Sequence, residues 1–282
     1  MKVAFVTDTG TGMSIEKWKK EGIYCLPLQI ECDGVSYDEY ETISYAQVIQ
    51  FLHEEKVLKT SLPKLGKIED CFDALKEEGY DTIFAVPICR GLSGTLDAME
   101  MIAKQKDMDF IGVDCYVTAV VQAEMIRQAK ALYEQGVALQ EIVNRINKMA
   151  ESCQTILLCD DLQHMKRGGR LTPMAAALGG LLKIKPILSI DKSTQGKVDV
   201  LDKVRTMKKA EEKVIATLIE KGATASSTFV VAHVDVLEAA KEYAARIQEA
   251  ITGAQVKIID LVSVVGIHTG LGCLAVQVFD EE

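Results

Sequence analysis

The stretch AVPICRGLSGTLDAMEMI, residues 85–102, decides the fold. Its first residues form an apolar run typical of a buried β-strand, and this run ends at Cys89. The turn Arg90-Gly91-Leu92-Ser93-Gly94-Thr95 follows, and a helical pattern begins directly after it. A strand that leads into a helix in this way predicts an open α/β sheet, in which ligands bind at the carboxyl ends of the strands.

The composition of the turn suggests what such a ligand would be. Gly91 and Gly94 free the backbone to expose N–H groups, and Ser93 adds a hydroxyl donor. Thr95 begins a helix whose positive dipole end faces outward. Together these groups predict a site for a small anion such as a carboxylate or a phosphate. An ordinary strand-to-helix turn has the same residues, so the motif alone leaves both interpretations open.

The first half of the chain alternates strands with single helices. Such alternation predicts a parallel sheet with helices on both faces. Near residues 33–60 we expect a small excursion, because Gly34 and several acidic residues follow one another there. We assign residues 1–152 to this N-terminal domain. Its strand candidates are KVAFV (2–6), IYCLPLQIE (23–31), DTIFAVPI (81–88) and FIGVDC (110–115).

The second half changes character. Some of its strand candidates are only a few residues apart, as across residues 193–196, and short connections join antiparallel neighbours. We therefore expect a mixed or antiparallel sheet with helices on one side, in a C-terminal domain of residues 153–282. The candidates are CQTILLCD (153–160), KPILSID (185–191), KVDVLDKVR (197–205), STFVVAHVD (227–235), QVKIIDLV (255–262) and CLAVQVF (273–279).

The composition is that of an ordinary soluble globular protein, with 48% hydrophobic and 26% charged residues. We find no signal peptide and no apolar stretch of the roughly 18–20 residues that a membrane span needs. The eight cysteines are scattered, without a C-x-x-C pair or a histidine at zinc-finger spacing. We therefore expect reduced thiols in a cytoplasmic protein, with no metal and no cofactor.

The charge of the chain is uneven. The formal net charge of −9 argues against general nucleic-acid binding. Residues 164–209, however, contain eleven lysines and arginines and three aspartates, which is a net charge of +8. A basic segment in an acidic protein suggests an anionic ligand or partner nearby.

Three further stretches have compositions that favour a binding site. Thr60-Ser61-Leu62-Pro63 places two hydroxyls before a proline, although a plain helix cap would also use them. Residues 266–272 set His268 in what we expect to be a glycine-flanked loop, where the backbone must approach something closely. Lys166-Arg167-Gly168-Gly169-Arg170 combines three cations with two glycines inside the basic segment.

Taken together, these motifs resemble the DegV family of fatty-acid-binding proteins, and the resemblance runs nearly end to end. Seven motifs stand in the order of the family. They are the turn Thr7-Asp8-Thr9, TS-x-P (60–63), GLSGT (91–95), the K-x-GGR stretch (166–170), IKPIL (184–188), VRTMKKA (204–210) and HTG-x-G (268–272).

The resemblance implies a two-domain α/β protein that holds a long-chain fatty acid in a buried tunnel between the domains. It implies a lipid carrier without catalysis of its own, whose fatty acid a separate ATP-dependent kinase converts to an acyl phosphate. It implies neither nucleic-acid binding nor stable membrane insertion. The residues that it places on the carboxylate are Thr60, Ser61, Ser93, Gly94 and His268, with Arg170 and Arg205 near the head group or the partner.

The chain departs from the family pattern at several positions. Leu62 and Lys64 stand where the family often has glutamine and serine, and Arg90 replaces a small hydroxyl residue. Leu271 stands where proline is common. The departures concern loop details, so they bear on chain preference and partner fit.

Two other functions compete with the carrier. In a serine acyl hydrolase Ser93 would be the nucleophile and His268 the base. Yet Gly91-Leu92-Ser93-Gly94 is not the G-x-S-x-G elbow, and no acid is clearly placed to orient the histidine. A kinase is disfavoured because the chain has no G-x-x-x-x-G-K-[ST] loop.

Two segments extend the carrier hypothesis. Residues 174–182, MAAALGGLL, are compatible with close helix packing or with a tunnel wall, and small side chains there would leave room for acyl carbons. We also expect the basic segment to form the docking face for the kinase or for the phosphates that it handles. Reversing the charges of Lys166 and Arg167 should then weaken acyl-phosphate production but not lipid binding.

Overall fold

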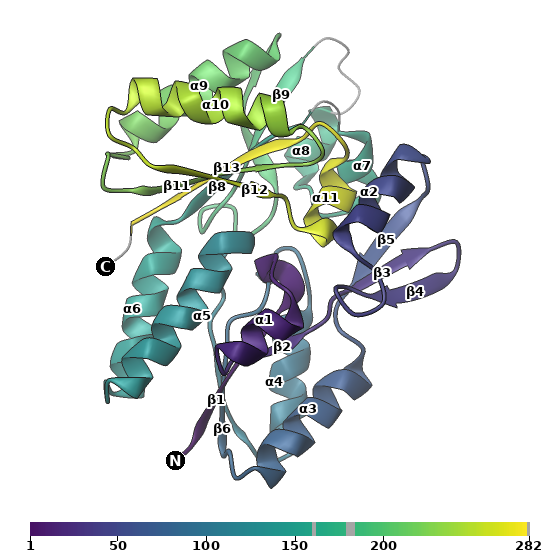
Figure 1. The fold of residues 1–282 in the computed structure, drawn as a ribbon, viewed down its shortest axis with the longest axis vertical. Coiled ribbons are helices and arrows are strands. Elements are labelled where there is room, and N and C mark those ends of the chain that lie inside the picture. Colours follow the sequence, from purple (N-terminus) through teal and green to yellow (C-terminus); the bar gives the residue numbers. More distant parts are fainter. Residues whose placement is uncertain (160–161, 179–183, 281–282) are drawn as a thin grey trace.

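The computed structural model describes residues 1–159, 162–178 and 184–280 (Figure 1). Its N-terminal part contains a four-stranded parallel sheet with the order β2-β1-β6-β7. The strands are β1 (Val3–Asp8), β2 (Tyr24–Leu26), β6 (Thr82–Ala85) and β7 (Asp109–Gly112). Every residue of β1 is buried, as expected for a parallel strand that is covered on both faces. The predicted parallel sheet is confirmed.

Helices cover both faces of this sheet. Because side chains alternate along a strand, Val3 and Phe5 point to one face of β1, and Ala4 and Val6 point to the other. The first face packs against α1 (Ile15–Lys20), α5 (Ala119–Glu134) and α6 (Leu139–Ser152). The second packs against α3 (Leu65–Glu77) and α4 (Thr95–Gln105), as Figure 1 shows.

A second, three-stranded antiparallel sheet stands apart from the first, in the order β4-β3-β5. It consists of β3 (Gln29–Cys32), β4 (Val35–Asp38) and β5 (Leu58–Ser61), with α2 (Tyr45–His53) between β4 and β5. The expected single strand over residues 23–31 is therefore wrong. Pro27 has no N–H to continue a ladder, and the N–H of Leu28 instead donates to the Thr9 hydroxyl at 3.0 Å.

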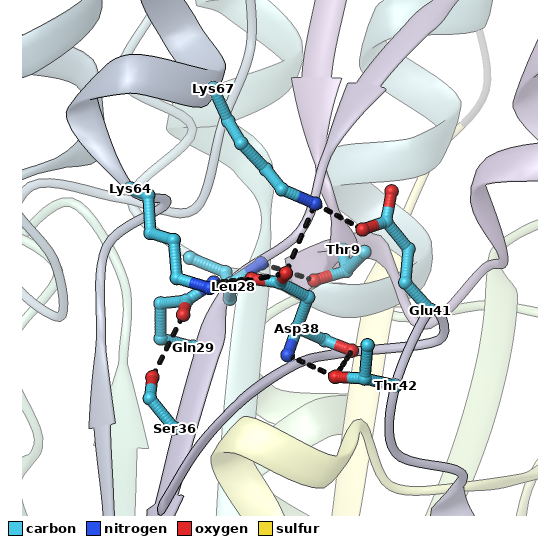
Figure 2. A network of polar contacts seen from close by, with 9 residues as sticks. All are labelled: Thr9, Leu28, Gln29, Ser36, Asp38, Glu41, Thr42, Lys64 and Lys67. Atoms are coloured by element: carbon cyan, nitrogen blue, oxygen red, sulfur yellow. Dashed lines mark hydrogen bonds and ion pairs between the residues drawn. The ribbon is translucent and has the colours of Figure 1, made fainter.

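The carboxylate of Asp38 attaches this small sheet to the start of α3 (Figure 2). It forms ion pairs with Lys64 at 3.2 Å and with Lys67 at 3.1 Å, and it accepts a hydrogen bond from the amide of Gln29. Lys67 also pairs with Glu41. The contacts hold the chain directly after β5, so the departure from the family pattern at Lys64 has a structural role.

The C-terminal part contains a six-stranded sheet in the order β10-β9-β8-β13-β11-β12. Its neighbours are antiparallel except for the pair β11–β12. Two helices, α9 (Met207–Glu220) and α10 (Leu237–Ala250), cover one face, which confirms the predicted mixed sheet. The strands are β8 (Gln154–Leu158), β9 (Lys185–Ile190), β10 (Asp199–Val204), β11 (Thr228–His233), β12 (Val256–Asp260) and β13 (Leu274–Phe279).

The other face of the C-terminal sheet looks toward the rest of the molecule. Leu157 of β8 and Leu188 of β9 share a core with Ile30 of the small sheet and with α11 (Ser263–Thr269). Two shorter helices, α7 (Gln163–Gly168) and α8 (Pro173–Leu178), lie beside this region (Figure 1). In the described ranges, no helix is long and apolar enough to cross a membrane.

Side-chain packing and a hydrogen bond also connect the N-terminal part, with its parallel sheet, to the C-terminal sheet. Val230 and Phe279 pack in the same core as α5 and α6, and the amide of Gln277 donates to the carbonyl of Thr118 at 2.8 Å. The domain limits 1–152 and 153–282 therefore stay a prediction.

Gly91 and Gly196 bring the turn before α4 against the turn between β9 and β10. A methyl group on Gly91 would lie 2.2 Å from the carbonyl carbon of Gly196, and one on Gly196 would lie 2.9 Å from the Cys89 sulfur. The two backbones can approach this closely because neither residue has a Cβ. Gly91 thus has a packing role that sequence analysis does not predict.

We predict that Gly91→Ala lowers the free energy of unfolding by about 1–3 kcal/mol, because the new methyl group meets rigid backbone. Gly94→Ala is the matched control, since its methyl group would meet only Leu62, at 3.9 Å. Urea unfolding of both variants measures the difference. Equal stability of the two variants would contradict the packing role.

Candidate functional site

A narrow cavity of about 50 Å³ lies where the three sheets meet, and we call it the apolar cavity. Leu157, Ile190 and Val198 contribute from the C-terminal sheet and its edge. Ile88 and Leu92 contribute from the carboxyl end of β6, where open α/β sheets bind ligands. Its polar lining residues are Thr60, Ser61, Ser93, Arg170, His268 and Thr269.

A second, wider cavity of about 390 Å³ shares Thr60, Arg170 and His268 with the first. These three residues therefore stand at the boundary between the two spaces. We call the second space the basic cavity, because its further lining includes Lys56, Lys59, His164 and Arg167. No aspartate or glutamate lines either cavity in the described parts of the chain.

At this boundary, Thr60 Oγ1 and His268 Nε2 form a hydrogen bond of 2.7 Å. The two residues are 208 positions apart, one on β5 and the other on α11. The expected loop around His268 is wrong, because this residue lies in the last turn of a helix. Of the glycines around it, Gly266 is helical, and only Gly270 and Gly272 have the left-handed backbone that favours glycine.

Two glycine–histidine contacts join α7 to α11. A methyl group on Gly168 would lie 2.3 Å from Nδ1 of His268. Conversely, a methyl group on Gly270 would lie 2.8 Å from the ring of His164. Each histidine ring thus rests on a glycine of the other segment, which explains in physical terms why the GGR and HTG motifs need glycine at these positions.

The electrostatics of the boundary favour an anion. Burial, and then the charges of Arg170 and His164, lower the pKa of His268 to about 4, so the imidazole is neutral at neutral pH. Arg170 is half-buried, and burial lowers its pKa as well. Its guanidinium donates to the carbonyls of Leu92, at 3.3 Å, and Gly168, and no carboxylate pairs with it among the described residues. A partly buried cation without a counter-charge is costly, and an anionic ligand would remove that cost.

The structure brings Ser93 and Ser61 to the apolar cavity, but not every predicted site residue. The Ser93 hydroxyl lies 2.8 Å from that of Thr95, and its N–H donates to the carbonyl of Cys89. Gly94 does not line the cavity. It precedes α4, and its N–H has no acceptor in the described chain, as is usual in a first helical turn.

Arg205 lies apart from the other predicted residues. It is exposed, and it directly follows β10, whose last residue pairs with Lys185. The cavity residues Ile190 and Val198 belong to the opposite end of the β9–β10 pair. Arg205 is thus not part of either cavity and faces solvent.

The remaining departures from the family pattern do not alter the cavity. Arg90 turns onto α4, where its guanidinium pairs with Asp97 at 2.7 Å and with Glu100 at 3.3 Å. Leu62 packs beside Gly94. Of the segment predicted as a possible tunnel wall, residues 174–177 do not line either cavity, and residues 179–182 lie outside the described residues.

Asp8 and Glu39 are two buried carboxyl groups that the sequence analysis did not predict as functional. Burial raises the pKa of Asp8 to about 6, although its side chain accepts hydrogen bonds from Gln122 and from the N–H of Ile88. Burial likewise raises the pKa of Glu39 to about 7. Asp8 is visible in the Thr7-Asp8-Thr9 motif, whereas nothing in the sequence around Glu39 indicates that it would be buried.

Glu39 connects three parts of the molecule. Its carboxyl accepts a hydrogen bond from Thr9 Oγ1 at 2.5 Å, and the same hydroxyl accepts the N–H of Leu28. The hydroxyl of Ser263 and the N–H of Val264, both at the start of α11, also interact with this carboxyl and oppose the rise in its pKa. Glu39 therefore lies between the β1 turn, the small sheet and the helix that carries His268.

Fold and site together define an α/β protein with a parallel and a mixed sheet, whose apolar cavity ends at hydroxyl, imidazole and guanidinium groups. A sequence model described as "Uncharacterised protein, DegV family" matches residues 2–281. The chain belongs to the DegV family.

Individual relatives agree with this assignment. A DegV domain-containing protein of Halalkalibacterium halodurans is 30% identical over 284 residues, which cover 100% of this chain and 99% of that protein. The crystal structure of a fatty acid binding DegV family protein from Streptococcus agalactiae has a TM-score of 0.90 at 27% identity, with full coverage of both chains. DegV from Bacillus subtilis, a fatty acid binding protein, shares the fold with a TM-score of 0.86 at 24% identity and full coverage.

We predict that His268 titrates near pH 4 in the ligand-free protein, because its burial beside Arg170 disfavours the imidazolium. Since this pKa lies below the ordinary 6.5, the stability that it contributes is complete above pH 6.5 and is lost as the pH falls toward 4. NMR of the histidine ring protons, assigned with a His268→Gln variant, measures the midpoint. A midpoint near 6.5 would contradict the described environment.

Proposed function

We propose that this protein binds a long-chain fatty acid and presents its carboxylate to a separate ATP-dependent kinase. The main support for this proposal is the set of residues at the boundary between the two cavities. There, an unpaired Arg170 and a neutral His268 stand at the end of an apolar cavity without any acidic lining residue in the described chain. An amphiphile with one negative charge and a thin apolar tail matches both features. The Streptococcus agalactiae protein, described as fatty acid binding, supports the choice of ligand.

In the proposed complex, the carboxylate takes the place between β5, α11 and the turn before α4. The hydroxyls of Thr60, Ser61 and Ser93, which line the apolar cavity, donate to its oxygens. His268 orients Thr60 or donates directly through Nε2, and Arg170 supplies the compensating charge. The arrangement uses hydrogen bonds to a charged acceptor, which are shorter and stronger than neutral ones.

The free energy of fatty-acid binding has one contribution from the acyl tail and another from the carboxylate head. Burying a methylene group contributes about 0.8 kcal/mol, so a tail of about 16 carbons offers on the order of 10 kcal/mol before ordering costs. Each hydrogen bond to the carboxylate contributes about 1.5–3 kcal/mol. The tail thus supplies most of the affinity, and the polar groups make burial of the head tolerable and orient it.

The geometry does not favour the alternative of a serine acyl hydrolase. Ser93 is hydrogen-bonded to Thr95, and His268 is hydrogen-bonded to Thr60. The groups that adjoin His268 are Arg170, His164 and Gly168, so a carboxylate to orient it as a base is missing from the described contacts. A non-catalytic carrier needs no such partner.

We predict that Thr60→Val and Ser93→Ala each weaken palmitate binding about 10- to 100-fold, because each removes one hydrogen bond to a charged acceptor. Ser226→Ala, in an exposed turn, is the matched control and should bind like the unmodified protein. Calorimetric titration with palmitate measures the affinities. If both site variants bound palmitate as tightly as the control, the proposed position of the carboxylate would be wrong.

We propose a partner kinase because the sequence has no loop of the type that binds the phosphates of ATP. An acyl phosphate forms when a carboxylate oxygen attacks the γ-phosphorus of ATP, the bond to the β,γ-bridging oxygen breaks, and ADP leaves. The sequence contains no phosphate-binding loop of the G-x-x-x-x-G-K-[ST] type, so a second protein would hold the ATP. We place its docking face at α7, because Lys166 is exposed there beside the basic cavity.

We predict that Lys166→Glu slows acyl-phosphate formation by the partner kinase several-fold and leaves palmitate binding unchanged, because Lys166 lines neither cavity. Lys192→Glu is the matched control from the same basic segment, since Lys192 lies in the β9–β10 turn and is paired there with Glu151 of α6. Steady-state kinetics with saturating palmitate measure the effect. Equal rates for the two variants would contradict docking at α7.

A further inference from the structure

Two segments that are far apart in the chain both line the apolar cavity. Leu28 lies directly before β3, whereas Val264 and Val265 lie in the first turn of α11. His268 follows Val264 by four residues on this helix, so the two side chains share one face. The position of α11 therefore sets both the apolar lining and the imidazole of the proposed carboxylate site.

Glu39 holds the backbone of Leu28 at both of its hydrogen-bonding groups. The N–H of Glu39 donates to the carbonyl of Leu28 at 3.0 Å. The N–H of Leu28 donates to Thr9 Oγ1, also at 3.0 Å, as Figure 2 shows. The same hydroxyl donates to the Glu39 carboxyl at 2.5 Å. A displacement of Glu39 would therefore disturb Leu28 both directly and through Thr9.

The carboxyl of Glu39 also reaches the start of α11, where the hydroxyl of Ser263 and the N–H of Val264 interact with it. Val262, the residue that caps this helix, makes no side-chain hydrogen bond to the first turn. A carboxylate has enough lone pairs to accept from Thr9, Ser263 and Val264 together, whereas a protonated carboxyl must donate one hydrogen itself. The ionised form thus matches the donors around it.

The carboxyl of Glu39 is deeply buried, with 1% of the residue exposed. Burial raises its pKa to about 7 against the hydrogen bonds of its three donors, and the charge of Asp8 on β1 adds to the rise. Cys25 on β2 and the adjacent Tyr40 are the other titratable groups that feel its charge. Both have a raised pKa and stay neutral. Glu39 therefore changes charge near neutral pH.

A buried carboxylate at this position has a cost for the fold. Because the pKa of Glu39 in the folded chain lies above the ordinary 4.5, its ionised form opposes folding, and stability is lost as the pH rises through about 7. Local features that lower stability are expected where a function needs them. The position of Glu39 between two lining segments of the cavity indicates which function this is.

We propose that ionised Glu39 is a positioning residue of the fatty-acid site, because it holds Leu28 and the start of α11 where the acyl chain and its carboxylate require them. The role rests on the proposed function, since it concerns the geometry of that same site. Glu39 lines neither cavity and does not touch the ligand. On protonation, the hydroxyls of Thr9 and Ser263 can accept where they had donated, but the N–H of Val264 cannot, so α11 loses this contact.

The test measures palmitate binding by the full chain at two pH values, one unit above and one unit below the Glu39 pKa of about 7. Calorimetric titration compares the unmodified protein with Glu39→Gln, which keeps the size of the side chain but cannot ionise. Ser263→Ala removes one donor and leaves the carboxyl in place. Glu211→Gln is the matched control, because Glu211 is also buried, pairs with Arg246 and lines neither cavity.

At the higher pH, we expect Glu39→Gln to weaken palmitate binding about tenfold and Ser263→Ala about threefold, with no change for Glu211→Gln. At the lower pH, the affinity of the unmodified protein should fall toward that of Glu39→Gln. Palmitate and Asp8 can also change charge in this range, but they do so in both proteins. The difference between the two pH profiles therefore reports on Glu39 alone.

Equal affinity of Glu39→Gln and the unmodified protein, or an equal loss at both pH values, would overturn the positioning role and leave the proposed function standing. Urea unfolding shows whether Glu39→Gln folds. If it did not, Ser263→Ala would decide, and binding as tight as that of the control would overturn the role. If the unmodified protein did not bind palmitate at either pH, the proposed function and the positioning role would both fail.

Discussion

The hydrogen bond between Thr60 and His268 is the contact on which the site depends. It joins β5 of the small sheet to α11 of the C-terminal part, and both of its residues line the apolar cavity as well as the basic one. Burial keeps the imidazole neutral, so neither residue of this hydrogen bond carries a charge that would neutralise the Arg170 guanidinium. That charge therefore stays available for a ligand at the boundary.

Close backbone approaches hold the parts around this bond in position. Gly168 lies against His268, and Gly91 lies against Gly196, at distances that a Cβ atom would not permit. Glu39 lies between the β1 turn and the start of α11, where it interacts with Thr9 and Ser263. The dimensions of the site are thus set by contacts between backbones and rings, which leave little freedom for side-chain rearrangement.

Much of the fold could be predicted, because apolar periodicity and connection length report directly on sheets and helices. The break at Pro27 and the helix around His268 could not, since a nearby Thr9 hydroxyl and tertiary packing override the local pattern. For the site, the family motifs indicated Thr60, Ser93, Arg170 and His268, which do converge. Gly91 packs against Gly196, and Glu39 interacts with Ser263. Both partners lie far away in the chain, so no local pattern indicates these roles.

In the proposed complex, one carboxylate is held between Thr60, Ser93 and His268 while its chain fills the apolar cavity. A crystal structure of the protein with palmitate tests this most directly. We expect carboxylate oxygens within hydrogen-bond distance of the Thr60 and Ser93 hydroxyls, and acyl carbons against Leu157 and Ile190. A carboxylate bound elsewhere, or a tail lying on the surface, would contradict it.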